Sequence, residues 1–167
     1  NMNETNGYNY KFWQIYYQWI LNANKILAGL EEVEITSQEL FDQIKGEALC
    51  IRAWAHFNLV QLYAKRYEAG KDNTQDGIPY REKAVAEEQA RNSVEDVYAK
   101  INNDLDEACI LLSGIKVNDV NHYSEMVVWG LKERVELAMQ DYNNAADSAG
   151  QYASLYESGG PPLWDGL

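Results

Sequence analysis

The sequence has 167 residues, of which 46% are hydrophobic and 24% charged, so it can form one domain with a packed core and is unlike a disordered chain. Its 26 acidic and 14 basic residues give a net charge of −12, which argues against a nucleic acid as partner because phosphates would be repelled. Two cysteines do not make a disulfide framework, and no apolar run is long enough to cross a bilayer.

Helical periodicity dominates the first 64 residues. Apolar side chains recur three or four apart over residues 8–28, which predicts a helix with one buried stripe. That stripe consists of Phe12, Tyr16, Trp19, Ala23, Ile26 and Leu30. A second helix is predicted from Thr36 to about Ala64, with a capping box between Thr36 and Glu39. Its stripe is Leu40, Ile44, Ala48, Ile51, Ala55, Leu59 and Leu62. From Ala48 onward its other faces are apolar too, so we predict that this helix is buried at the centre of the fold.

The rest of the chain is predicted to be a long loop followed by three helices. Residues 68–92 are polar and contain two glycines and a proline, as expected of a loop. Helices are predicted over 93–112, with Asn92 or Ser93 as the cap, over 124–140 and over 143–156. No segment alternates as a strand does, so we predict an all-α fold. We assign residues 1–157 to this helical scaffold and residues 158–167 to a Gly/Pro-rich tail that continues into a missing region.

The two last helices resemble one tetratricopeptide unit. Trp129, Asp141-Tyr142 and Ala145 fit the register of that motif, whereas Glu133 stands where the motif has a small residue. A generic antiparallel helical hairpin is the alternative interpretation.

The sequence shows no constellation typical of catalysis or metal binding. His56 and His122 have no partner at ligand spacing, and Cys50 and Cys109 lie inside helices, where we expect buried thiols. Residues 72–77 begin like a calcium loop, but Lys83 stands at the twelfth position, where a bidentate Glu is needed. We therefore predict no enzymatic activity, no metal and no cofactor.

Tyrosine and tryptophan are unusually frequent. Twelve Tyr and five Trp stand against three Phe, and their flat, partly polar rings suit wet binding surfaces and stacking on sugars. Most of them, including Trp19, Trp54 and Trp129, lie on helical stripes and are expected in the core. Tyr8, Tyr10 and Tyr80 are the expected exceptions, at the N-terminus or in the long loop.

Five segments, in order along the chain, have the pattern of one known protein family. The most specific is Gly46-Glu47-Ala48-x-x-x-Arg52-Ala53-x-Ala55-x-Phe57-x-Leu59-Val60. The other four are Tyr17-x-x-Ile20-x-x-Ala23-Asn24-x-Ile26-Leu27, Gly77-Ile78-Pro79-Tyr80-Arg81, Arg91-x-Ser93-Val94-x-x-Val97-Tyr98-x-x-Ile101-x-x-Asp104-Leu105-x-x-Ala108, and Leu131-Lys132-x-Arg134-Val135-x-Leu137 with Asp141-Tyr142 and Ala145. Together these five segments resemble the SusD/RagB family of nutrient-binding outer-membrane lipoproteins.

The resemblance implies tetratricopeptide-like helical hairpins around the central helix and a binding function without catalysis. It implies that the ligand is an oligosaccharide or another nutrient and that the partner is a SusC-like TonB-dependent transporter. It also implies a lipid anchor and a place on the extracellular face of the outer membrane, both for a full-length protein of which we expect this chain to be a fragment. The alternative is a tetratricopeptide-type interaction scaffold with no small-molecule site.

Two sets of residues are singled out. Glu47 and Arg52 are charges on an otherwise apolar helix, where they must be paired, so we predict that both are structural. The resemblance places Asn6, Tyr8, Asn9 and Tyr10 near the ligand, just before the first helix, and their rings and amides suit stacking on sugars and hydrogen bonding to hydroxyls.

Overall fold

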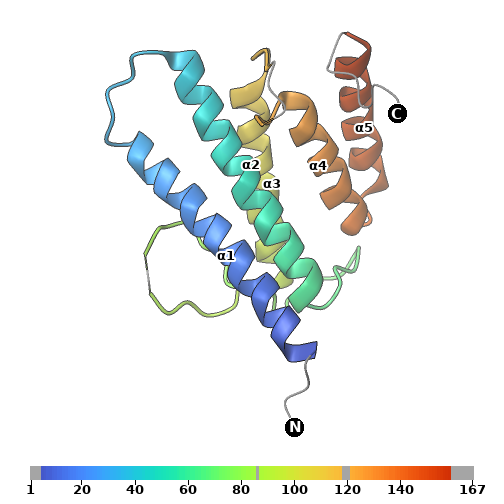
Figure 1. Cartoon of the computed structure of the whole chain (residues 1–167). Helices are drawn as coiled ribbons and strands as arrows, with labels where there is room; N and C mark the ends of the chain where they lie inside the picture. Colours follow the sequence, from blue (N-terminus) through green and yellow to red (C-terminus); the bar gives the residue numbers. More distant parts are fainter. Residues whose placement is uncertain (1–4, 86, 118–120, 159–167) are drawn as a thin grey trace.

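The computed structural model describes residues 5–85, 87–117 and 121–158, with side chains from Tyr10 onward. Within that part the chain forms helices and no β-strand, which confirms the predicted all-α fold. The helices are α1 Thr5–Leu30, α2 Gln38–Tyr63, α3 Val94–Leu112, α4 Glu125–Ala138 and α5 Tyr142–Glu157 (Figure 1). Apart from Ser158, the predicted tail lies outside the described residues, so the division of the chain there stays a prediction.

Side-chain caps fix where several helices begin. Ser93 Oγ accepts a hydrogen bond from the backbone N–H of Asp96 at 3.1 Å, which confirms one of the two predicted caps. The expected cap of α2 at Thr36 is wrong by one residue, because Ser37 Oγ accepts from the N–H of Leu40 at 3.3 Å. Ser37 is the N-cap because its extended backbone directs the short hydroxyl toward that free N–H group.

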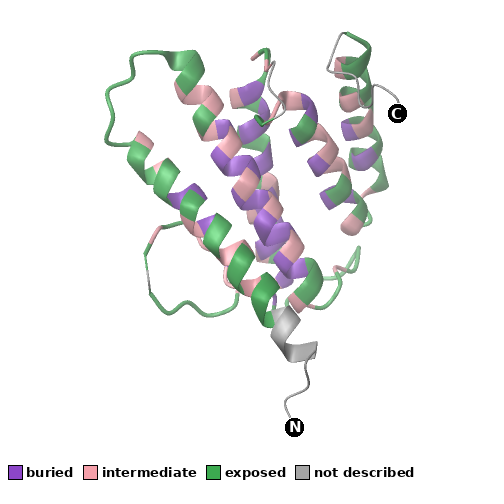
Figure 2. Ribbon diagram, viewed as in Figure 1, coloured by how far each residue is buried: buried purple, intermediate pink, exposed green. Residues whose placement is uncertain are grey.

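The second helix is central, as predicted. It packs against α1 on one side and α3 on the other, while α4 and α5 form a hairpin in which α4 packs on α3 and α2 and α5 packs on α4. Buried residues run along most of α2 and one face of α3, as Figure 2 shows. Cys50 and Cys109 are buried free thiols, and burial raises the pKa of both to about 12.

The loop between α2 and α3 is anchored rather than loose. Gly77 donates its N–H to the Asn92 carbonyl at 2.8 Å, and Asn92 donates to the Ile78 carbonyl at 3.1 Å. This short pairing directs Ile78 and Tyr80 into the core, where both are fully buried. The expectation that Tyr80 lies outside the core is therefore wrong: its ring packs parallel to His56, with the two ring centroids 3.7 Å apart.

The predicted buried stripe of α1 is wrong in part. Phe12, Trp19 and Ile26 are exposed, Ala23 is buried as predicted, and the inner face also carries Ile20 and Asn24. The inner face packs against α2 and also meets the backbone of the loop, whose carbonyls need the polar groups of Tyr17 and Asn24. In α2, the predicted stripe residues Leu40, Ile44 and Leu62 are exposed for a different reason, since they lie near the helix ends, beyond the packed centre.

Candidate functional site

A buried cluster of polar side chains joins α1, α2, α3 and the loop. We call it the arginine cluster: Asn24, Arg52, His56, Tyr80 and Asp104. Arg52 donates from Nε and Nη2 to the two carboxylate oxygens of Asp104, both at 2.7 Å, and from Nη1 to Asn24 Oδ1 at 3.0 Å. Tyr80 donates its hydroxyl to Asp104 Oδ2 at 2.6 Å. The Asp104 carboxylate is thus held by two partners from two different elements.

His56 connects the cluster to the loop as a neutral ring. Its Nε2 accepts the backbone N–H of Arg81 at 3.0 Å, and its Nδ1 lies 2.9 Å from the Arg52 carbonyl. Because a carbonyl only accepts, Nδ1 carries the proton. Burial is the main reason that the pKa of His56 falls to about 3.

The first helix also binds the loop backbone. Tyr17 donates its hydroxyl to the Pro79 carbonyl at 2.8 Å, and Asn24 Nδ2 donates to the Arg81 carbonyl at 2.9 Å. Sequence reasoning singled out Arg52 but assigned no role to Asn24, Tyr80 or Asp104. The signal was present, because all three belong to the segments that resemble the SusD/RagB family.

The other charge predicted to be structural, Glu47, lies at the edge of α2. Its Oε1 accepts from Gln43 Nε2 at 3.1 Å and lies 2.8 Å from Nδ1 of His122, in the segment before α4. The structure thus places both predicted residues next to partners, and the contribution of each to stability stays a prediction.

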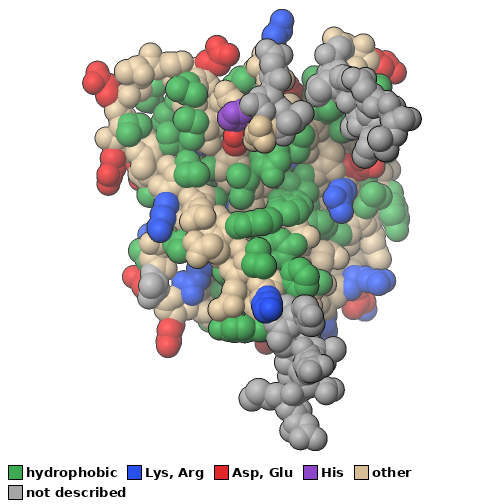
Figure 3. Space-filling model, in the orientation of Figure 1, with side chains coloured by type: hydrophobic (Ala, Val, Ile, Leu, Met, Phe, Trp, Pro, Cys, Tyr) green, Lys and Arg blue, Asp and Glu red, His purple; other side chains and the backbone are tan. Residues whose placement is uncertain are grey.

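An exposed aromatic face lies over α1 and α2. We define it as Phe12, Ile15, Tyr16 and Trp19 of α1 with Trp54 of α2. The rings of Trp19 and Trp54 are stacked, with centroids 5.2 Å apart and an interplanar angle of 16°, and Tyr16 packs edge-on against both. Trp19 is 40% exposed, so the expectation that it belongs to the core is wrong. Hydrophobic side chains gather in the middle of this view of the molecule (Figure 3).

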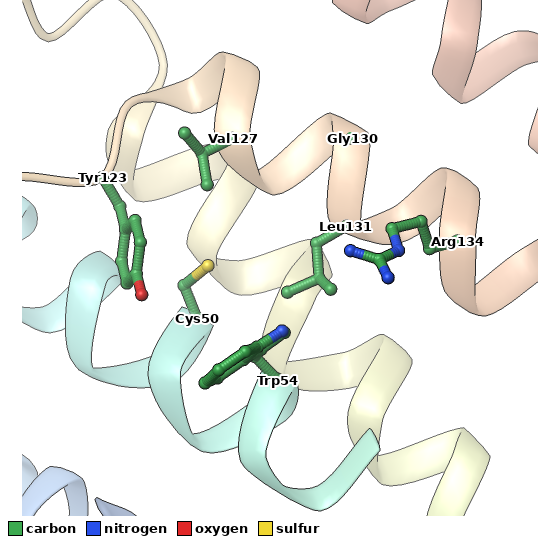
Figure 4. A pocket seen from close by; sticks show the side chains of 7 residues that line it. All are labelled: Cys50, Trp54, Tyr123, Val127, Gly130, Leu131 and Arg134. Carbon is green, nitrogen blue, oxygen red and sulfur yellow. The ribbon is translucent and has the colours of Figure 1, made fainter. Parts of the chain in front are cut away.

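A pocket of about 180 Å³ adjoins the aromatic face between α2 and α4. Cys50, Val127, Gly130 and Leu131 form its apolar part. Trp54, Tyr123 and Arg134 contribute polar atoms at its edges, and Figure 4 shows Tyr123 at one end and Arg134 at the other.

The structure places the predicted ligand residues inside α1. The helix begins at Thr5, so the expectation that Asn6, Tyr8, Asn9 and Tyr10 precede the helix is wrong. The helix extends because nothing in the sequence before Tyr8 breaks it apart from Gly7, which a helix tolerates at a modest cost. The side chains of Asn6, Tyr8 and Asn9 lie outside the described residues, while Tyr10 is 63% exposed. Their role in binding stays a prediction.

The described residues contain no group of three or more His, Cys, Asp or Glu side chains that could hold a metal ion. Among the same residues, every helix is too short or too polar to span a bilayer.

Comparison with protein families identifies the family of this chain. The model of a SusD-like family, described as starch-binding and associating with the outer membrane, matches residues 1–137. The chain belongs to this SusD-like family. No curated protein matches it.

Solved structures agree with the SusD-like assignment. The chain is 28% identical to a Bacteroides vulgatus protein assigned to sugar binding, with a TM-score of 0.81, and covers 89% of its own length and 34% of that structure. A SusD-like carbohydrate-binding protein from the same organism is 26% identical, with a TM-score of 0.77 and coverages of 92% and 32%. A laminarin-binding SusD-like protein shares the fold at 23% identity and a TM-score of 0.69, with coverages of 84% and 29%. The chain therefore spans about a third of the length of the solved SusD-like proteins that it matches.

Proposed function

We propose that the chain is the helical scaffold of a protein that binds an oligosaccharide at the outer cell surface and passes it to a SusC-like TonB-dependent transporter. The observation that carries this proposal is the match of residues 1–137 to the SusD-like family. Binding takes place without chemical change to the ligand, so the protein is a carrier and not an enzyme. In the full-length protein a lipid anchor holds it on the extracellular face of the outer membrane.

The exposed aromatic face supports a sugar as ligand. A protein surface that binds carbohydrate typically presents solvent-facing aromatic rings, because the apolar face of a pyranose stacks on them. The proposed ligand residues Asn6, Tyr8, Asn9 and Tyr10 belong to the first turns of α1, the helix that also carries Trp19. Two sugar-binding or carbohydrate-binding neighbours above 25% identity support the same class of ligand.

The glycan part of the proposal is tested by calorimetry on the full-length protein. The probes are malto-oligosaccharides, chosen because the family is described as starch-binding, together with an array of bacterial, plant and algal glycans. We expect saturable binding of at least one oligosaccharide, with unchanged ligand recovered afterwards. Recovery of cleaved sugar would contradict the carrier role, and the absence of binding to every glycan would contradict the ligand class.

The transporter part is tested separately by mixing the purified protein with a SusC-like transporter from the same organism. We expect co-elution in size-exclusion chromatography. Complex formation by a protein that binds no glycan would favour the alternative, a tetratricopeptide-type interaction scaffold. Glycan binding without any complex would support the glycan-binding part of the proposal and contradict the transporter as partner.

A further inference from the structure

The pocket between α2 and α4 holds three polar groups that the protein itself does not use. They are the indole N–H of Trp54, the hydroxyl of Tyr123 and the guanidinium of Arg134. None of them makes a hydrogen bond or ion pair with any described residue. Figure 4 shows the indole nitrogen and the guanidinium at one end of the pocket and Tyr123 at the other. Converging polar groups around an apolar floor are typical of a small-molecule site.

Trp54 is fixed in place before any ligand arrives. One face of its ring stacks on Trp19, and Tyr16 packs edge-on against it at a centroid distance of 5.8 Å. The opposite face lines the pocket, across from Cys50 and Leu131. A rigid indole wall is suited to the flat apolar face of one sugar ring.

The size of the pocket limits the ligand. Its volume of about 180 Å³ is below the roughly 300–1,000 Å³ of pockets that enclose drug-sized molecules. One pyranose ring fits this space, while the rest of an oligosaccharide would continue over the aromatic face.

The charge of the lining selects among sugars. No Asp or Glu side chain lines the pocket, although the chain has 26 acidic residues and 14 basic ones. The polar groups are a cation and two donors, of which only the Tyr123 hydroxyl can also accept a hydrogen bond. At C6 a neutral hexose offers a hydroxyl, which uses an acceptor as well as a donor, whereas a hexuronic acid offers a carboxylate, which needs donors alone and pairs with a guanidinium through two parallel bonds. Burial raises the pKa of both Tyr123 and Cys50, so neither adds a negative charge that would repel an anion.

We infer that this pocket binds one acidic sugar residue, a pyranose whose ring stacks on Trp54 and whose carboxylate pairs with Arg134. The inference rests on the proposed carbohydrate function and deepens it, because it names uronic-acid-containing glycans as the ligand class. Trp54 Nε1 and the Tyr123 hydroxyl form hydrogen bonds with hydroxyl groups of the sugar ring.

The test compares two sugars that differ only at C6, methyl galacturonoside and methyl galactoside. Both are titrated into the full-length protein labelled with ¹⁵N-tryptophan, and the indole N–H signal of Trp54, assigned with Trp54→Phe, is followed by NMR. We expect the galacturonoside to shift this signal and to bind at least about tenfold more tightly than the galactoside, as a charge-assisted pair implies. Added salt should weaken the preference.

Arg134→Gln is the key variant, with Arg66→Gln as its control. Both arginines are exposed, but Arg66 lies in the loop after α2, away from the pocket. We expect Arg134→Gln to abolish the preference for the acidic sugar with no change in melting temperature, and Arg66→Gln to leave both unchanged.

Three outcomes would overturn the inference. The first is a Trp54 signal that neither sugar shifts. The second is an acidic preference that survives Arg134→Gln. The third is a lowered melting temperature for Arg134→Gln in the full-length protein, which would show that the pocket is occupied by another protein segment. Binding of malto-oligosaccharides alongside any of these three outcomes would preserve the proposed function while overturning this site. Failure of the whole glycan array would remove the proposed function, and the galacturonoside titration would still decide the pocket.

Discussion

Arg52 of α2 and Asp104 of α3 form a two-bond ion pair inside the protein, with both N–O distances at 2.7 Å. Their side chains are only 10% and 9% exposed. Burial lowers the pKa of Arg52, but the hydrogen bonds and charge of Asp104 outweigh it, and the net shift is upward. A buried charge is tolerated only when it is paired in this way, so each residue depends on the other.

The first prediction is that Arg52→Met lowers the free energy of unfolding by about 3–5 kcal/mol, because it leaves the Asp104 carboxylate buried without its charged partner. Lys45→Met is the matched control: it breaks the pair with Glu107, which joins the same two helices but is 34% and 48% exposed, and should cost about 0–1 kcal/mol. Urea denaturation measures both. If Arg52→Met kept its stability and lost glycan affinity instead, Arg52 would belong to the ligand site.

The helices were predictable from sequence where burial follows apolar periodicity. On α3, the expected stripe from Val94 to Leu112 is fully buried, because both neighbours of that face are apolar. On α1 the same reasoning selected the wrong face. Its inner side binds loop carbonyls through Tyr17 and Asn24, so the polar residues are inside and Trp19 is outside. Amphipathic patterns assume that burial means contact with hydrocarbon, whereas the inner side of α1 meets both the apolar core, through Ile20, and the backbone of the loop.

The second prediction concerns Gly77. A Cβ at this position would lie 2.9 Å from the Asn92 carbonyl oxygen and 3.1 Å from backbone atoms of Ser93, in the pairing that anchors the loop. Gly77→Ala should therefore destabilise the protein by about 1–3 kcal/mol, as overpacking does. Gly150→Ala is the control, since α5 leaves open space around that position, and it should stabilise by about 0.5–1 kcal/mol. Equal melting temperatures for the two variants would contradict the prediction, because they would show that the loop backbone can move away from the added methyl group.

The candidate site was only partly predictable for a related reason. A charged residue at position 52 of an apolar helix indicates that it has a partner. The partners, Asn24 and Asp104, lie 28 and 52 residues away in sequence. Spacing along one helix gives no distance to another helix. The pocket was missed because Trp54 and Arg134 come from different helices, and neither helix shows a motif for it.

The third prediction uses pH. The pKa of His56 is about 3 in the folded protein against an ordinary value of 6.5, so between these values the unfolded chain binds a proton that the folded one does not. The free energy of unfolding should therefore fall as pH drops from about 6.5 toward 3. Above about pH 6.5 His56 is neutral in both states and adds no pH dependence. His56→Gln should be less stable at pH 7, because it loses the stacking on Tyr80, but its stability should depend less on pH between 6.5 and 4.5. Parallel pH profiles from urea denaturation would contradict this assignment.

The last prediction concerns Tyr10, the one proposed ligand residue whose side chain is described. The ring is 63% exposed and lies on the helix that carries the aromatic face, so it can stack on a sugar without being needed for folding. Tyr10→Ala should lower the glycan affinity of the full-length protein by about 0.5–1.5 kcal/mol, the scale of one aromatic contact, with an unchanged melting temperature. Tyr142→Ala is the matched control, because Tyr142 is 67% exposed but begins α5, outside that face, and it should leave affinity unchanged. Calorimetry with the tightest-binding glycan of the array compares the three proteins. Equal affinities for all three would mean that the first turns of α1 lie outside the ligand site.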